Sequence, residues 1–90
     1  MKFEWDARKA RLNFAKHRIT FEEAVTVFQD PLSVTALDPD HSVRERRFVT
    51  FGLSCKGKLL QVSHTEHRYS IRIISARAAT KREIRIYEEG

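Results

Sequence analysis

The apolar residues of this chain change their spacing once, at Asp30-Pro31, and that change limits the possible folds. Between Phe21 and Phe28 they recur three and four residues apart, which is the spacing of one helix face. From Leu32 onward, four segments rich in Val, Ile, Thr and Phe alternate with short polar stretches, as in strands joined by hairpins. Helices followed by a run of strands predict an α+β domain with the helices packed on one face of the sheet.

The local signals give the order of the elements. We expect a short strand over 2–5, helices over 7–17 and 20–30, strands over 32–37, 43–52, 58–66 and 70–77, and a helix over 80–88. Asp6 is a candidate N-cap, and Thr20 with Glu23 and Thr80 with Glu83 have the form of capping boxes. Because hairpin-sized turns separate the strands, we expect an antiparallel sheet of four to five strands. Ninety residues predict a single domain over 1–90.

Composition excludes several classes of protein. Apolar residues make up 41% of the chain and charged residues 32%, which is typical of a globular domain. No apolar run reaches the roughly 20 residues of a membrane span, and the start lacks a secretory signal. Cys55 is the single cysteine, so a disulfide framework is excluded and a reducing cytoplasm is the expected compartment.

The positive charge is concentrated in the second half of the chain. Residues 1–40 contain six basic and seven acidic residues, whereas residues 41–90 contain eleven basic and five acidic ones. A basic half of this kind favours a polyanion as the partner, and nucleic acid is the commonest polyanion. The alternative is a solvated surface that binds nothing.

Candidate catalytic side chains gather on the last two predicted strands. His64 and Glu66 lie two residues apart and therefore share one face of a strand. Arg72 alternates with Ile71 and Ile73, which places it on the opposite, open face of the sheet. Arg77 has the same parity as the two isoleucines, so it reaches the face of Arg72 only through a bulge or at the end of the strand.

These residue types suit the cleavage of an RNA phosphodiester. The 2′-hydroxyl attacks the neighbouring phosphate when a base takes its proton and an acid protonates the leaving oxygen. His64, expected to titrate near neutral pH, and Glu66 are the candidate proton carriers. Arg72 and Arg77 would neutralise the charge that develops on phosphorus. Arg47, on the preceding strand, and Tyr87, on the last helix, would bind RNA.

Each of these residues also has a structural interpretation. His64 shares parity with Leu60 and Val62 and could complete a row of core residues. Glu66 could form an ion pair with a neighbouring arginine, and Tyr87 could be a packing residue. His64 and His67, three apart on a strand, point to opposite faces, so we expect no metal site and no cofactor.

An ordered set of motifs resembles the BrnT toxin family of bacterial type II toxin–antitoxin systems, within the RelE-like superfamily. The matching residues are Phe3-Glu4-Trp5-Asp6, Lys9, Asn13, Lys16-His17, Phe21-Glu22-Glu23-Ala24, Phe28-Gln29-Asp30-Pro31, Ile71-Arg72-Ile73-Ile74-Ser75-Ala76-Arg77, Ala79-Thr80, Glu83 and Tyr87-Glu88. Two positions depart from the family pattern. Arg18 stands where the family usually has the glycine of a helix end, and Ile84 stands where an arginine is common.

The resemblance implies a RelE-like fold, with two N-terminal helices and a C-terminal helix packed on the sheet. It also implies a ribonuclease that arrests translation and a BrnA-type antitoxin with a ribbon-helix-helix domain, joined to the toxin in a 2:2 complex. Operator DNA would be bound only through the antitoxin. The alternative function is a non-catalytic nucleic-acid-binding or corepressor module, in which His64 and Glu66 are ordinary packing and ion-pair residues.

Overall fold

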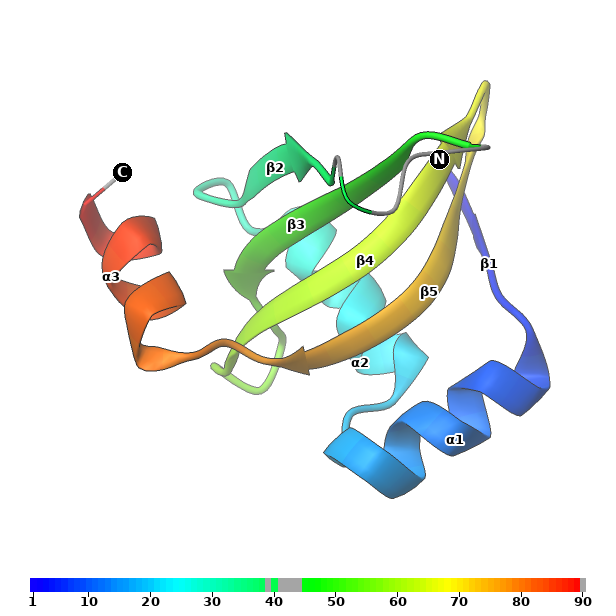
Figure 1. Ribbon diagram of the computed structural model, residues 1–90, viewed down its shortest axis with the longest axis horizontal. Coiled ribbons are helices and arrows are strands. Elements are labelled where there is room, and N and C mark those ends of the chain that lie inside the picture. The colour runs from blue at the N-terminus through cyan, green and yellow to red at the C-terminus, as the bar shows by residue number, and fades with distance from the viewer. Residues whose placement is uncertain (39, 41–44, 90) are drawn as a thin grey trace.

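The computed structural model of the chain describes residues 1–38, 40 and 45–89 and has an α+β architecture (Figure 1). Its elements, in chain order, are β1 (Lys2–Glu4), α1 (Ala7–His17), α2 (Phe21–Val25), the 3-10 turn η1 (Thr26–Gln29), β2 (Val34–Leu37), β3 (Arg47–Leu53), β4 (Leu59–His67), β5 (Ser70–Ala78) and α3 (Lys81–Glu89). The strand predicted from residue 43 begins at Arg47; residues 43–44 and Pro39 of the predicted turn lie outside the described residues.

The five strands form a mixed sheet in the order β1-β5-β4-β3-β2. Strands β2 to β5 form the predicted antiparallel meander. The expectation of a wholly antiparallel sheet is wrong, because β1 pairs with β5 in parallel, Phe3 opposite Ile71. No hairpin joins these two strands. The chain between them includes α1, α2 and three strands, so it can return to β5 in either direction.

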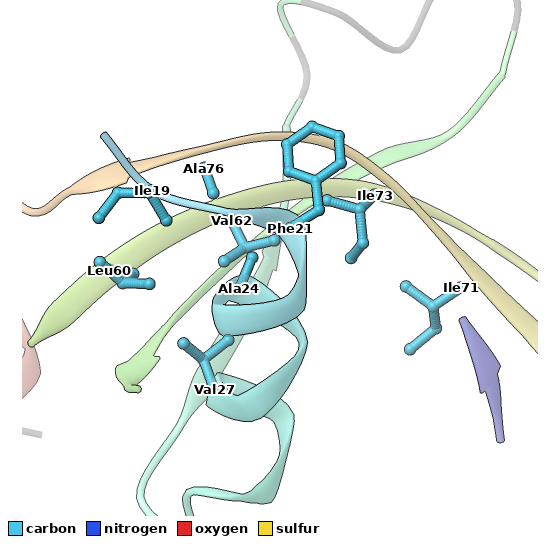
Figure 2. Close-up of a cluster of buried hydrophobic side chains, with 9 residues drawn as sticks. All are labelled: Ile19, Phe21, Ala24, Val27, Leu60, Val62, Ile71, Ile73 and Ala76. Carbon is cyan, nitrogen blue, oxygen red and sulfur yellow. The ribbon is translucent and has the colours of Figure 1, made fainter. Parts of the chain in front are cut away.

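The hydrophobic core lies between α2 and the inner face of β4 and β5 (Figure 2). Its buried side chains are Ile19, Phe21, Ala24, Val27, Leu60, Val62, Ile71, Ile73 and Ala76. The helix predicted over 20–30 is α-helical only as far as Val25 and then tightens into η1. This tighter turn passes very close to β3: a Cβ added to Gly52 would lie 3.0 Å from the Val27 carbonyl oxygen. Glycine therefore allows η1 to pack directly on the sheet.

Side-chain caps fix the helix starts. Asp6 accepts hydrogen bonds from the backbone amides of Arg8 and Lys9, as predicted. Thr80 and Glu83 form a complete capping box, since each side chain bonds the other residue's amide. The Thr20 hydroxyl accepts the Glu23 amide, but the predicted return contact is wrong. The carboxylate of Glu23 is buried and instead accepts a hydrogen bond from Ser54 at 2.7 Å.

The edge of β5 is protected by a side chain where β1 ends. Asn13, buried on α1, accepts the Ala76 amide through Oδ1 and donates to the Ala76 carbonyl through Nδ2. The same nitrogen also donates to the carbonyl of Ile19. Asn13 thus replaces a neighbouring strand for one residue pair and fastens α1 to the sheet.

The position of α3 differs from the expectation that it packs on the sheet like the other helices. It has no buried residue and lies beyond the end of β3 (Figure 1). Two polar contacts hold it: Arg77 pairs with Glu83, and the Tyr87 hydroxyl donates to Asp30. None of the described helices has the length and apolar content needed to cross a membrane.

Candidate active site on the open face of the sheet

A β-bulge in β5 decides which arginines share a face. Ser75 pairs with Ser63 and Ile73 pairs with His64, so Ile74 is an extra residue with no opposite partner. Ile73 and Ala76 are consequently both buried, although they lie three residues apart. Arg77 therefore lies on the same face of the sheet as Arg72. Strand parity allowed this only through a bulge or at the end of the strand, and the bulge is present.

Three arginines lie on the sheet face that α2 and η1 do not cover, which we call the open face. Arg47 on β3 and Arg72 on β5 lie on either side of Thr65 in β4, and Arg77 lies opposite Gln61. Arg72 is exposed and, among the residues that the structure describes, its side chain has no hydrogen bond or ion pair. Its charge acts on Asp6, where it is one of the smaller causes of the lowered pKa of that carboxyl, and its exposed guanidinium can still reach an anion.

Beside these arginines the open face is hollowed into a concavity of about 250 Å³. Its lining residues are Asp38, Arg47, Gln61, Ser63, Ile74 and Ser75. The set combines a cation, a carboxylate, an amide and two hydroxyls over an apolar patch. Such groups can bind a phosphate and can take a proton from an attacking hydroxyl or give one to a leaving oxygen.

Arg77 is already engaged by a carboxylate. Its two terminal nitrogens donate to the two oxygens of Glu83, both at 2.9 Å, and one of them also donates to the Ala78 carbonyl. The Arg77 hydrogen bond is the main reason why the pKa of Glu83 is lowered. Direct phosphate binding by Arg77 requires this ion pair to open. As described, Arg77 joins the end of β5 to the first turn of α3.

Tyr87 also holds α3 in place. Its hydroxyl donates to Asp30, whose carboxylate also accepts the backbone amides of Leu32 and Leu53. The bond to this carboxylate raises the pKa of Tyr87 to about 12. These contacts place Tyr87 beside the end of β3, and it does not line the open-face concavity.

His64 lies on β4, next to the strand that carries Arg72, but its side chain is on the opposite face of the sheet. Its imidazole is fully buried, 5.0 Å from the ring of Phe28 and 5.9 Å from that of Phe48. Nε2 is 2.7 Å from the Thr50 hydroxyl, which is 2.7 Å from that of Thr35. His64 is thus the inner end of a chain of hydrogen bonds across three strands.

Burial changes the acid–base behaviour of His64. Its pKa is lowered from 6.5 to about 4 by burial, so the ring is neutral at pH 7 rather than titrating near neutrality as its residue type suggests. Glu66 shares its face, as predicted, but the 4.0 Å from Nδ1 to Oε1 is too long for a hydrogen bond. Nδ1 has no hydrogen-bond partner among the described residues. The roles of His64 and Glu66 in proton transfer stay predictions.

Comparison with known proteins identifies the family. A family model described as "Ribonuclease toxin, BrnT, of type II toxin-antitoxin system" matches residues 5–83. The chain belongs to the BrnT toxin family. A crystal structure at 1.1 Å resolution of the Brucella abortus ribonuclease toxin BrnT has a similar fold, with a TM-score of 0.66 and 21% sequence identity. The match covers 90% of this chain and 99% of that one. No curated protein sequence matches the chain.

The BrnT family is a family of ribonuclease toxins of type II toxin–antitoxin systems, which implies an antitoxin as the partner of this chain. Sequence reasoning selected Arg47, which lines the concavity, and Arg72, which lies on the same face outside it, but it missed the other polar residues of the lining. Gln61 and Ser63 alternate with the core residues Leu60 and Val62, and that parity was a usable signal for the open face. Asp38 gave no such signal, because it follows the last residue of β2.

Within the described part of the chain, no three or more His, Cys, Asp or Glu side chains are grouped so that they could hold a metal ion. His64 is buried and His67 is exposed, which agrees with their opposite faces on β4. The described residues therefore give no geometric support for a metal centre on β4.

Proposed function

We propose that this BrnT family member is an endoribonuclease that cleaves RNA without a metal ion and thereby inhibits translation. The observation that supports this most directly is the set of arginines on the open face, where Arg47 lines a concavity that contains hydroxyls and a carboxylate and Arg72 lies across β4 from it. In the proposed reaction the 2′-oxygen bonds to phosphorus and the bond to the 5′-oxygen breaks. The products are a 2′,3′-cyclic phosphate and a free 5′-hydroxyl.

Arg47 and Arg72 would bind the phosphate and stabilise the extra negative charge of the transition state. Their positions on either side of Thr65 suit a single phosphate held over β4. Arg77 would contribute in the same way if RNA displaces Glu83, and Tyr87 would position RNA at the margin of the site.

Proton transfer needs a base that receives the 2′-hydroxyl proton and an acid that supplies a proton to the leaving 5′-oxygen. His64 and Glu66 remain the predicted pair, and for them the inner face of β4 must become accessible to RNA. On the open face itself, the carboxylate that lines the concavity is Asp38, and we propose it as a further base. Substituting His64 and Asp38 separately distinguishes proton transfer on the inner face of β4 from proton transfer on the open face.

The antitoxin implied by the family is proposed to be a BrnA-type ribbon-helix-helix protein in a 2:2 complex with the toxin. Operator DNA would be bound by the antitoxin and not by this chain. The complex would form in the cytoplasm, which agrees with the single cysteine, Cys55, exposed and unpaired.

The test is cleavage of a defined RNA in EDTA by the purified, antitoxin-free protein. We expect Arg72→Ala to reduce the cleavage rate by about 100-fold or more, as for the loss of one transition-state donor elsewhere. Lys58→Ala is the matched control, because Lys58 is exposed and does not line the concavity. Thermal melting of each variant separates loss of activity from loss of folding. Asp38→Asn and His64→Gln, assayed alongside, show which of these residues is required for cleavage.

Wild-type activity in Arg72→Ala would contradict the proposed site. Cleavage that requires added Mg²⁺ would contradict metal independence. Binding of RNA without turnover, with a steep dependence on salt, would instead support the alternative of a non-catalytic nucleic-acid-binding module. If free RNA is not cleaved, the same assay with ribosomes tests for a ribosome-dependent enzyme.

A further inference from the structure

The first helix is strongly basic, although residues 1–40 as a whole contain one more acidic than basic residue. From Ala7 to Phe21 there are five Lys or Arg residues and no Asp or Glu. Of the acidic residues that balance them in the count, Asp6 caps the start of α1 beside Lys9, and others lie away from the helix, as in α2, where Glu23 is buried. The surface of α1 is therefore basic, and the fold decides what lies next to it.

A groove of about 250 Å³ runs between α1 and β5. It is lined by Lys9, Leu12, Asn13, Lys16, His17, Ile74 and Ser75. Ile74 and Ser75 also line the concavity on the open face. The two hollows therefore meet at the bulge of β5, with Arg47 on one side of it and Lys9 and Lys16 on the other.

The groove exists because β1 is short. β1 pairs only as far as Glu4 opposite Arg72, so the rest of the β5 edge is not covered by a strand. α1 lies beside that edge (Figure 1) and is held to it by the Asn13 side chain. A helix leaves a furrow where it meets the edge of a sheet, and the bulge residue Ile74 lies in it.

We propose that a single strand of RNA continues from the open-face concavity, crosses β5 at Ile74 and Ser75, and lies in the groove along α1. Lys9 and Lys16 would contact its phosphates, and the exposed side chain of Leu12 would contact a base. This proposal rests on RNA being the substrate, as argued above. It extends the contact of the protein with RNA beyond the nucleotides that react.

The chemistry of the groove favours a single-stranded polyanion. Two lysines border a floor that is partly apolar, with Leu12 60% exposed and Ile74 half-buried. Proteins hold single strands without reading their sequence in basic grooves that follow the backbone and offer side chains, commonly aromatic, to the bases. Here the aliphatic side chains of Leu12 and Ile74 would contact the bases. Because Ile74 and Ser75 line both hollows, one strand of RNA can occupy both.

The test is binding of a single-stranded RNA oligonucleotide whose 2′-hydroxyls are methylated, so that it binds but is not cleaved. The double variant Lys9→Ala/Lys16→Ala should weaken binding and reduce the slope of log K against log salt by about 1.4, since each lost phosphate contact on a single strand contributes about 0.7. Lys58→Ala/Lys81→Ala removes the same charge from exposed positions that line neither hollow, and should leave the slope unchanged.

An unchanged slope in the Lys9/Lys16 variant, or an equal decrease in both double variants, overturns the proposal. So does normal RNA binding combined with weaker binding of the antitoxin, because the groove would then belong to the protein partner. Failure of the proposed catalysis gives a different result. The wild-type protein would then leave unmodified RNA uncleaved, whereas the Lys9/Lys16 variant would still bind the methylated RNA with two phosphate contacts fewer than the wild type.

Discussion

At the end of α1 the backbone turns through a single residue, Arg18, with φ 60° and ψ 25°. This left-handed conformation allows the Arg18 amide to bond the Phe14 carbonyl and close the helix. Among the described residues, Arg18 is the one non-glycine residue with a positive φ. Its guanidinium carbon lies 5.6 Å from the centre of the Phe14 ring, which offsets part of the cost.

Replacing Arg18 by glycine, the residue that the family usually has here, should stabilise the chain. Glycine removes a steric cost of about 1–2 kcal/mol, but the ring contact is lost and the unfolded chain gains freedom. We therefore expect a net gain of about 0.5–1 kcal/mol in the free energy of unfolding, measured by urea denaturation. Arg11→Gly, in the middle of the same helix, is the control and should cost about 1 kcal/mol. Destabilisation by Arg18→Gly would show that the ring contact outweighs the backbone cost.

Single residues also show what the sequence could predict about the site. Strand parity was sufficient to place Arg72 on the open face and to show that Arg77 required an irregularity. It could not show which irregularity, because a bulge at Ile74 depends on how β4 and β5 pair. The role of His64 was left open between core and site, and its ring lies in the core beside Phe28 and Phe48.

At the level of elements, the side chain of Asn13 attaches α1 to the sheet. The Asn13 side chain makes three hydrogen bonds, two to Ala76 and one to Ile19, and all of them are buried. They satisfy buried backbone groups on the edge of β5 at Ala76 and, at Ile19, in the turn between α1 and α2.

Asn13→Ala should lower the free energy of unfolding by about 2–4 kcal/mol, because it leaves buried backbone groups of Ala76 and Ile19 without partners. Thermal or urea denaturation measures the loss. Leu12→Ala, next to it but largely exposed, should change stability by less than about 0.5 kcal/mol. A loss no larger for Asn13→Ala than for Leu12→Ala would mean that water replaces the side chain.

Elements were predicted well where local signals decide them. The bounds of α1, the starts of α2 and α3, and the meander from β2 to β5 follow from caps, apolar spacing and short turns. The parallel pairing of β1, the change from α2 to η1, and the position of α3 depend on contacts between distant parts of the chain. Local pattern carries no information on such contacts.

At the scale of the whole molecule, the stability of the fold depends on pH through a few buried or bonded groups. His64 is neutral when folded, with its pKa lowered to about 4. The hydrogen-bonded carboxyls of Asp6, Asp30 and Glu83 have pKa values below their usual range. They contribute stability above their unfolded pKa values, near 4, and lose it as the pH falls through the folded values.

His64 acts in a higher pH range than the carboxyls. As the pH falls from about 6.5 to 4.5, the unfolded chain protonates His64 and the folded chain does not, so the free energy of unfolding should fall by about 2–3 kcal/mol. Urea denaturation across this range measures the decrease, and His64→Gln should lack most of it. A variant with the same pH dependence as the wild type would show that other groups titrate instead.

The bulge at Ile74 also affects how relatives of this protein should be compared. Arg72 and Arg77 lie five positions apart, an odd interval, and yet share a face only because one residue between them is unpaired. In a relative whose β5 pairs without interruption, two arginines on one face must be separated by an even interval. A gap of one residue in an alignment across this strand therefore marks a change in pairing. Two relatives can present the same pair of charges while differing in the number of residues between them.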